Sequence, residues 1–411
     1  MTVRLARPPP GLPKDMLKLF PLFIGAALAL ATLSPAKAET LQVGPERALK
    51  LPSAAAATAH DGDVIEIDAG DYPGDVATWR QNDLTVRGVG GRPRIIGTGR
   101  FVEDRGLWAA LGNNFHVENV EFTHSRVPGG NGAGILASGR DLTVSDCVFR
   151  DNEDGILATV ARGDIVIERS EFDHNGTPNG QTHGIYIGRA RSLTVRGSYF
   201  HDTTTGHHVK SRALTNFILD SRFIDGKRGS ASYAIEFPNA GRAIVLGNVI
   251  EKGRRAQNLS MIAYGLEGEL NPSQTLLIAY NTLVSENFAA TFLYSVAPTP
   301  LYAIDNIFVG PGEVLRGAGK LVNNLYAVKS ARRPAIFDAS GNSGNRVVTD
   351  IGFADAAEHD YRLSATSPAI GMAIAPPTAQ GLIPKNEPET PIGSHPRASS
   401  KDVGAYESEM P

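Results

Sequence analysis

Short stretches in which every second residue is hydrophobic recur along the middle of the chain, and each is followed by one large apolar residue. Residues 142–144 (Leu-Thr-Val) precede Phe149, and residues 165–167 (Ile-Val-Ile) precede Phe172. Such alternation predicts β-strands with one buried face. The large residues are 23 positions apart between Phe149 and Phe172 and 33 apart between Ile250 and Leu283, which predicts a parallel solenoid with one coil per repeat. The series consists of Phe122, Phe149, Phe172, Phe200, Phe223, Ile250, Leu283 and Phe308.

A second regular series supports the stacking of these coils. Two positions before most of the large residues stands a small or amide side chain, and side chains of this kind can hydrogen-bond from one coil to the next at a turn. Cys147 belongs to this series, so we interpret it as a small buried residue and not as a nucleophile. The members are Cys147, Ser170, Ser198, Ser221, Asn248, Asn281 and Asn306.

The segment before the repeat has a different pattern. Residues 45–60 are alanine-rich and predict one amphipathic helix, which would cap the open hydrophobic end of the first coil. Helical periodicity is almost absent after residue 60, so the predicted fold class is all-β. From about residue 331 the repeat fades into a proline-rich and irregular tail.

Three motifs show a resemblance to a known group of proteins. They are Gly-Asp-Val-Ile at 62–65 after the predicted helix, Ser-Pro-Ala-Ile at 367–370 and Val-Gly-Ala-Tyr-Glu at 403–407. Together with the coils, they resemble the pectate-lyase-like superfamily over nearly the whole mature chain. The resemblance implies a right-handed parallel β-helix with an N-terminal capping helix. It does not specify the reaction, since that superfamily includes lyases, hydrolases, epimerases and non-catalytic spikes.

The first residues carry the features of an export signal. Basic residues precede the apolar run 19–33, and Ser-Pro-Ala-Lys-Ala at 34–38 places small residues where a signal peptidase reads them. We expect cleavage after Ala38 and a secreted or periplasmic product; the alternative is an uncleaved membrane anchor. The predicted organisation is a signal peptide at 1–38, the β-helix with its cap at 39–330, and irregular C-terminal coils and a tail, packed on the solenoid, at 331–411.

Charge and cysteine content narrow the choice of partners. The 40 basic and 43 acidic residues give a net charge of −3, so no broad basic field attracts nucleic acid or anionic lipid. A single cysteine allows no internal disulfide and no thiolate metal site. We expect a monomer with a polysaccharide substrate, without nucleic acid and, after signal cleavage, without a membrane.

Alignment of the coils brings ionisable residues onto one surface. The residues expected to point outward from successive coils include Tyr186, Lys210 and Glu236, and adjacent strands are ~4.8 Å apart. The coils on either side carry leucine, glycine or alanine at these positions. A charged patch inside an otherwise apolar face favours a functional site over ordinary cross-strand pairing. The other members of the predicted patch are His183, His201, His207, His208, Arg212 and Tyr233.

These residues suit β-elimination on a uronate-containing polysaccharide. Lys210 and Arg212 would neutralise the C5 carboxylate. The base would be His183, His207 or His208, with Lys210 itself as the alternative. Tyr186 or Tyr233 would donate a proton to the leaving oxygen, and we expect Tyr233, Glu236 and His201 to contact substrate. Glu236 could instead orient Lys210 or bind calcium, a cofactor that the resemblance to similar lyases implies.

Other functions remain open at this point. Hydrolysis requires two carboxyl groups about the scissile bond, and the expected face offers no Asp-Asp pair. Epimerisation shares the proton-abstraction step, although the Asp-Pro-His-Asp run of mannuronan epimerases is missing. A non-catalytic glycan-binding or structural β-helix would favour aromatic platforms, whereas aromatic residues make up 7% of the chain and the patch is ionisable.

Overall fold

Parallel strands in three long sheets make up most of the protein. The computed structural model describes residues 38–159, 163–268, 270–297, 301–328, 334, 337, 339–374 and 383–408. The predicted signal peptide, apart from its last residue, lies outside these ranges. No helix in the described ranges is long and apolar enough to cross a membrane.

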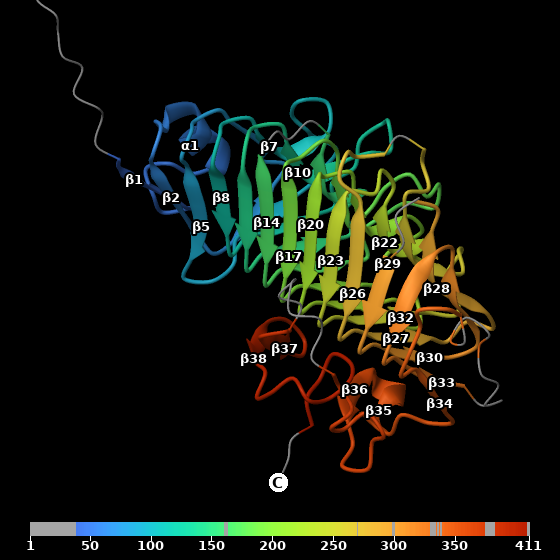
Figure 1. Ribbon diagram of the computed structural model, residues 1–411. Helices are drawn as coiled ribbons and strands as arrows, with labels where there is room; N and C mark the ends of the chain where they lie inside the picture. Colours follow the sequence, from blue (N-terminus) through green and yellow to red (C-terminus); the bar gives the residue numbers. More distant parts are fainter. Residues whose placement is uncertain are drawn as a thin grey trace, which may run out of the picture. The chain divides into compact units, whose positions relative to one another are not determined.

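Each central coil contributes one strand to each sheet, and these strands pair with their counterparts in the preceding and the following coil (Figure 1). In the described part of the chain, sheet 1 has 12 strands: β1 (Thr40–Val43), β2 (Val64–Asp68), β5 (Thr85–Val89), β8 (Phe115–Glu118), β11 (Leu142–Ser145), β14 (Asp164–Glu168), β17 (Ser192–Arg196), β20 (Thr215–Leu219), β23 (Arg242–Leu246), β26 (Thr275–Ala279), β29 (Leu301–Ile304) and β32 (Gly319–Val322).

Sheets 2 and 3 repeat this arrangement within the same described ranges. Sheet 2 has ten strands: β4 (Ala77–Trp79), β7 (Gly106–Ala110), β10 (Ala133–Ala137), β13 (Asp154–Ala158), β16 (Ile185–Ile187), β19 (His207–Ser211), β22 (Tyr233–Phe237), β25 (Ser260–Tyr264), β28 (Ala290–Ser295) and β31 (Gly312–Arg316). Sheet 3 has 12: β3 (Asp71–Pro73), β6 (Arg94–Ile96), β9 (Glu121–Thr123), β12 (Val148–Arg150), β15 (Glu171–Asp173), β18 (Tyr199–His201), β21 (Arg222–Ile224), β24 (Val249–Lys252), β27 (Thr282–Ser285), β30 (Ile307–Val309), β33 (Leu325–Ala327) and β34 (Arg346–Val348).

The predicted large residues fill the interior of the coils. Phe149, Phe172 and Phe200 are fully buried, and their rings stack at centroid distances of 4.8 and 4.4 Å. Phe122 and Phe223 extend this column in both directions. This arrangement is a parallel β-helix, and it confirms the periodicity seen in the sequence.

The predicted series of small and amide side chains is a continuous hydrogen-bonded ladder. The backbone NH of Asn281 donates to Asn306 Oδ1 at 2.9 Å, and the NH of Asn248 donates to Asn281 Oδ1 at 2.9 Å. Beyond Asn306 the ladder continues through Asn324 and Asn345. At the other end the Cys147 NH donates to Ser170, and burial raises the pKa of the Cys147 thiol to about 12, which confirms that Cys147 is a buried structural residue.

The N-terminal helix is shorter than predicted. Helix α1 covers Pro52–Thr58, within the predicted range 45–60, and its buried residues Ala55 and Ala56 belong to the hydrophobic core of the coils. Proline at its first position fixes the φ angle for helix entry and lacks the NH that would have no partner there.

The residues after β34 cover part of sheet 3. Tyr361, Ala405 and Tyr406 pack with Ile224 and Val249 from the outer face of that sheet. This part contains the hairpins β35–β36 (Phe353–Asp355, Asp360–Leu363) and β37–β38 (Asn386–Pro388, Ser394–Pro396) and the short 3₁₀ helix η2 (Ala356–Glu358). The backbone of this C-terminal part also hydrogen-bonds to the coils, since the Gly404 NH donates to the Asp305 carbonyl at 3.0 Å.

Candidate functional site

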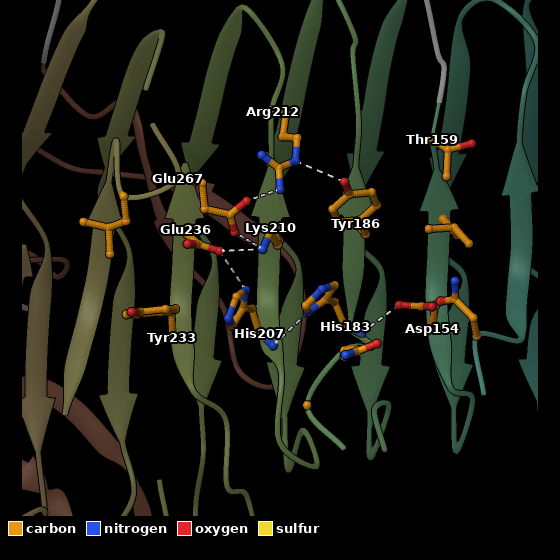
Figure 2. A pocket seen from close by; sticks show the side chains of 15 residues that line it. Asp154, Thr159, His183, Tyr186, His207, Lys210, Arg212, Tyr233, Glu236 and Glu267 are labelled. Carbon is orange, nitrogen blue, oxygen red and sulfur yellow. Dashed lines mark hydrogen bonds and ion pairs between the residues drawn. The ribbon is translucent and has the colours of Figure 1, made fainter. Parts of the chain in front are cut away.

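The predicted polar patch lines a pocket on the outer face of sheet 2. The pocket has a volume of about 650 Å³ and extends over strands β13, β16, β19 and β22 (Figure 2). Seven of the nine predicted residues line it: His183, Tyr186, His207, Lys210, Arg212, Tyr233 and Glu236. The pocket also includes Asn131, Asp154, Leu157, Thr159, Gly180, Gln181, Leu266 and Glu267.

The sheet register places the central residues side by side. Tyr186 pairs with Lys210, and Lys210 pairs with Glu236, on three consecutive strands. The residue before each of them, such as Val209, is fully buried in the core. Strand alternation therefore directs these three side chains outward, as the sequence predicted.

Lys210 and Arg212 both contact one carboxylate that comes from a loop. Glu267 lies between β25 and β26; its Oε1 accepts a hydrogen bond from Lys210 Nζ at 2.5 Å, and its Oε2 accepts one from Arg212. Lys210 Nζ also lies 3.2 Å from Glu236 Oε2. Burial tends to raise the pKa of Glu267, but the hydrogen bonds from Lys210 and Arg212 outweigh it and lower that pKa overall. One face of the pocket thus holds two cations with a carboxylate between them.

The Arg212 guanidinium is fixed by neutral partners as well. Its Nε donates to the Tyr186 hydroxyl at 3.1 Å, and its Nη1 donates to Asn239 Oδ1 at 2.6 Å. A planar guanidinium with several directed partners keeps its orientation, which suits it to grip a carboxylate with two hydrogen bonds.

Two stacked histidines form the opposite side of the pocket. The rings of His183 and His207 are 4.7 Å apart, and Tyr233 packs on His207 at 5.0 Å. Burial, together with the Lys210 charge, lowers the pKa of His183 to about 3. Burial and the neighbouring His183 and Lys210 hold the pKa of His207 well below its usual value. Both imidazoles are therefore neutral at physiological pH and can accept a proton.

Glu236 lies beside both His207 and Lys210. Its Oε2 is 3.2 Å from His207 Nδ1, although neither atom has an aligned hydrogen-bond partner among the described residues. Burial raises the pKa of Glu236, while Lys210 opposes that shift. A carboxylate at this position favours the His207 tautomer with its proton on Nδ1, which leaves Nε2 as the basic nitrogen.

Two acidic pocket residues were missing from the prediction. Asp154 lies at the start of β13, level with His183 in the neighbouring coil. Its Oδ1 accepts a hydrogen bond from the His183 NH at 2.7 Å. Burial raises the pKa of Asp154 to about 8. Alignment of one more coil with the row that contains His183 and His207 would have found Asp154. The signal for Glu267 is the spacing of 33 residues between Ile250 and Leu283, the longest in the series, which leaves room for a loop over the sheet.

The predicted role of His208 in this patch is wrong. His208 and Val209 are both fully buried, so the alternation of inward and outward side chains breaks between them and His208 points into the core. It is fully buried, with Nε2 2.9 Å from Asp225 Oδ1 and Nδ1 2.8 Å from Thr203 Oγ1. A side chain inside the core cannot contact a polysaccharide.

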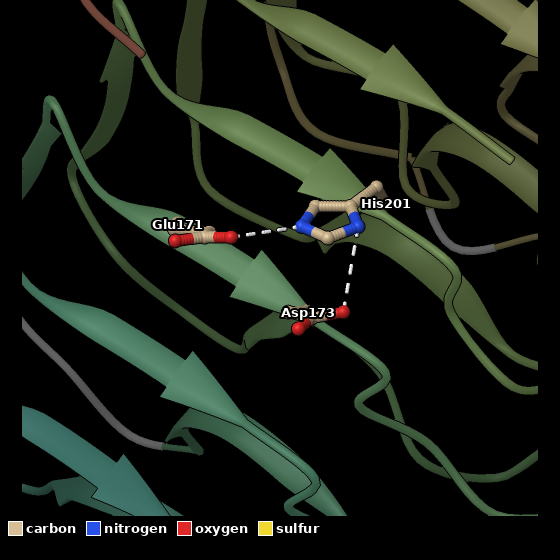
Figure 3. A group of neighbouring side chains, drawn as sticks. All are labelled: Glu171, Asp173 and His201. Carbon is tan, nitrogen blue, oxygen red and sulfur yellow. Dashed lines mark hydrogen bonds and ion pairs between the residues drawn. The ribbon is translucent and has the colours of Figure 1, made fainter. Parts of the chain in front are cut away.

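His201 belongs to another sheet and is not part of the pocket. It lies on β18 of sheet 3, where Nε2 is 3.0 Å from Glu171 Oε1 and Nδ1 is 3.4 Å from Asp173 Oδ1 (Figure 3). Burial tends to lower its pKa, but the hydrogen bonds to Asp202 and Glu171 outweigh burial and raise the pKa to about 9. His201 therefore carries a proton and acts as the cation of a carboxylate cluster.

Comparisons with known proteins agree with this fold. A family model described as "Right handed beta helix region" matches residues 98–231, a range that contains His183, Tyr186, Lys210 and Arg212. The solved structure of pectate lyase Pel9A is similar with a TM-score of 0.57 and 14% sequence identity, over 90% of this chain and 96% of that chain. A search of curated proteins finds no match.

Two further structures are similar at lower scores. An alginate lyase from Paenibacillus sp. str. FPU-7 has a TM-score of 0.47 and 12% identity, over 75% of this chain and 99% of that one. A pectin methylesterase from Aspergillus niger has a TM-score of 0.42 and 12% identity, over 77% of this chain and 92% of that one. At such identities the likeness to pectate lyase Pel9A concerns the fold alone, and the reaction has to be argued from the site.

Proposed function

This chain has the right-handed parallel β-helix fold of the pectate-lyase-like superfamily, and we propose that it is a polysaccharide lyase that cleaves an acidic, uronate-containing glycan by β-elimination. The observation that carries the proposal is the position of Glu267. Its carboxylate lies between Lys210 and Arg212, so the pocket already accommodates a carboxylate on two cations. The carboxylate of a uronate residue would replace Glu267 there.

The two cations would prepare the substrate for proton loss. β-Elimination removes the proton at C5, next to the carboxylate, and the negative charge that develops spreads onto the carboxylate oxygens. Hydrogen bonds from Lys210 and Arg212 would stabilise that charge more strongly in the transition state than in the ground state. Lys210 and Arg212 are largely buried, so water screens their charges less than it would screen exposed ones.

His207 is the base that the geometry favours. Its imidazole is neutral, and Glu236 beside Nδ1 would offset the burial and the Lys210 charge that disfavour the imidazolium formed when Nε2 takes the C5 proton. Lys210 suits this role less well, because its ammonium contacts both Glu236 and Glu267. As the C5–H bond breaks, a C4–C5 double bond forms, the C4–O4 bond breaks, and Tyr186 would protonate the leaving oxygen; Tyr233 is the alternative donor.

A calcium ion at Glu236 fits these residues poorly. Calcium binds six to eight oxygen ligands, whereas the neighbours of the Glu236 carboxylate are the ammonium of Lys210 and the imidazole of His207. The proposed reaction therefore relies on Lys210 and Arg212 for charge neutralisation. We expect activity to change less than twofold after exhaustive treatment with a calcium chelator; a loss that added calcium restores would contradict this assignment.

The test is a screen of uronate polymers for the absorbance of unsaturated sugar products. Wild type should release such products from at least one polymer, and Lys210→Ala should lower kcat/KM by about 100-fold or more, since a charge-stabilising group contributes about that much. Arg87→Ala, on the exposed face of sheet 1, is the matched control and should leave the rate unchanged.

The alternatives predict other results in the same screen. New reducing ends without unsaturation would indicate hydrolysis, and inversion at C5 without cleavage would indicate epimerisation. Binding of a polymer without any product would support a non-catalytic glycan-binding protein. Each of these outcomes would contradict the lyase proposal.

We further propose that the protein acts as a monomer outside the cytoplasm. The basic and apolar residues 1–38 support export, and a polymeric glycan is a substrate found outside the cytoplasm. Determination of the N-terminus of the protein recovered from an exporting host should give Glu39.

A further inference from the structure

Two carboxylates contact the ammonium of Lys210, and they are held in different ways. Glu236 stands on strand β22, and its side chain is 3% exposed, so burial holds its carboxylate in place. Glu267 stands on the loop between β25 and β26, and its side chain is 37% exposed (Figure 2). Rotation about its side-chain bonds would carry the Glu267 carboxylate from the cations into solvent.

The backbone of Glu267 is anchored independently of its carboxylate. The Glu267 NH donates to the Pro238 carbonyl at 3.1 Å, and the Gly265 NH donates to the Phe237 carbonyl at 2.8 Å. Phe237 ends β22 and Pro238 follows it, so these hydrogen bonds attach the loop to the neighbouring coil. The Glu267 side chain can therefore leave the two cations while its main chain stays in place.

Lys210 and Arg212 keep other partners when the Glu267 carboxylate leaves. Lys210 Nζ lies 3.2 Å from Glu236 Oε2, and Arg212 Nε donates to the Tyr186 hydroxyl at 3.1 Å. These contacts orient both cations, so Glu267 is not required for that purpose. Without Glu267, two positive charges face the single buried carboxylate of Glu236. One carboxylate from a ligand would restore the balance of charge.

We propose that Glu267 determines specificity as an intramolecular competitor: its carboxylate occupies the place of the substrate carboxylate and excludes small free anions, including single uronates. This inference rests on the proposed function, since it concerns the same pocket. Every carboxylate ligand must displace Glu267, and its apparent affinity falls in proportion to the fraction of molecules in which the cations are free.

The competition favours polymeric substrates over single sugars. A monouronate gains the contacts with Lys210 and Arg212 that Glu267 loses, so the exchange gives it little net affinity. An oligomer also contacts the rest of the pocket, which extends to Gln181 and Asp154 on preceding coils. These additional contacts would supply the free energy that displaces Glu267.

The experiment measures the binding of a monouronate and of uronate oligomers by calorimetry, with His207→Asn present in every protein to prevent turnover. Glu267→Gln keeps the shape of the side chain and removes its charge. It should bind the oligomers about 10- to 100-fold more tightly than the parent, since a competing charge-assisted contact is lost. It should also bind the monouronate, for which the parent should show no measurable affinity.

Two further variants complete the set. Glu267→Ala removes the side chain and should give the same gain as Glu267→Gln. Glu66→Gln is the matched control, because the Glu66 carboxylate also pairs with an arginine, Arg87, on sheet 1. It should bind every ligand like the parent.

The possible failures are separable. If neither Glu267 variant binds the oligomers more tightly while wild type forms unsaturated products, the competitor role is wrong and the proposed function stands. A gain in Glu267→Ala alone would show that the side chain acts by its size, and oligomer gains without monouronate binding would refute the exclusion of small anions. If both variants gain affinity for all ligands but wild type forms no unsaturated product, the competitor role holds and the lyase reaction is refuted. If no uronate ligand binds to any of the proteins, both proposals fall.

Discussion

Two adjacent histidines on β19 have opposite environments. His207 faces the pocket, where its ring stacks on His183 and meets Tyr233 edge-on, whereas His208 points into the core beside Asp225. Adjacent residues of the strand point to opposite sides here, and Val209 after His208 is fully buried as well. The two positions should therefore separate catalysis from stability.

We expect His207→Asn to lower kcat by about 100- to 10,000-fold, the range for loss of a general base, with little change in the melting temperature. His208→Asn should do the reverse, because a shorter side chain leaves Asp225 or Thr203 without its buried partner, at a cost of about 1–3 kcal/mol in the free energy of unfolding. Rate measurements and chemical denaturation on both variants check this. A catalytic defect in folded His208→Asn as large as that of His207→Asn would contradict the assignment.

His201 should make stability depend on pH in a defined window. Its pKa is about 9 in the folded protein and 6.5 in the ordinary state, so the folded protein holds this proton more tightly. The resulting stabilisation is fully present below pH 6.5 and is lost as pH rises through 9.

Replacement of His201 should remove this pH dependence of stability. The difference in unfolding free energy between wild type and His201→Gln should shrink as pH rises from 6.5 to 9, when measured by denaturation at several pH values. A difference for His201→Gln that grows with pH would show that the proton is not held by the Glu171 and Asp202 contacts.

At the scale of elements, the ladder of amide side chains joins one coil to the next. The Asn281 side chain accepts from the Asn248 NH and donates to the carbonyl of Val245 and to Asn306 Oδ1, all within the buried interior. One residue thus satisfies polar groups on the coils before and after it. Such networks are costly to break because their members have no water to replace a lost partner.

Asn281→Ala should therefore destabilise the protein by about 2–4 kcal/mol, since at least two buried groups lose their partners at about 1–3 kcal/mol each. Gln42→Ala, which removes an exposed hydrogen bond from Arg47, should cost less than about 1 kcal/mol. Melting temperatures and chemical denaturation measure both. Equal effects at the two positions would mean that the ladder does not contribute to cohesion between coils.

The elements were predictable because the same strand pattern recurs once in each coil. Phe149, Phe172 and Asn281 could be placed from spacing alone, and the register of Tyr186 with Lys210 followed from the aligned strands. The inward direction of His208 could not be predicted from strand alternation, because its neighbour Val209 points inward as well. Glu267 also escaped prediction, because a loop position carries no period.

At the scale of the whole molecule, the C-terminal residues shield an apolar face. Tyr361 and Tyr406 cover Ile224, Val249 and Val284 on the outside of sheet 3. Val403 and Ala369 do the same for Ile307 and its neighbours. An uncovered face of this kind on a stack of parallel strands would invite association between molecules.

A chain that ends at Val348 should retain its coils but expose this face. We expect it to aggregate during expression or to bind a hydrophobic dye strongly, and to melt at a lower temperature than the full chain. Tyr406→Ala, a milder change at the same interface, should lower the melting temperature without aggregation. A truncated chain that stays monomeric and melts at the wild-type temperature would show that this covering is dispensable.

The candidate site takes one or two side chains from each of several coils, and this constrains how the sequence can evolve. Loops that carry no pocket residue can gain or lose residues, because the sheet sets the spacing of Tyr186, Lys210 and Glu236. Duplication of a whole coil outside Asp154–Glu267 would lengthen the molecule and leave the site intact. Deletion of one coil inside that range would bring together side chains that now lie two strands apart, and would create a different arrangement of charges in a single genetic event.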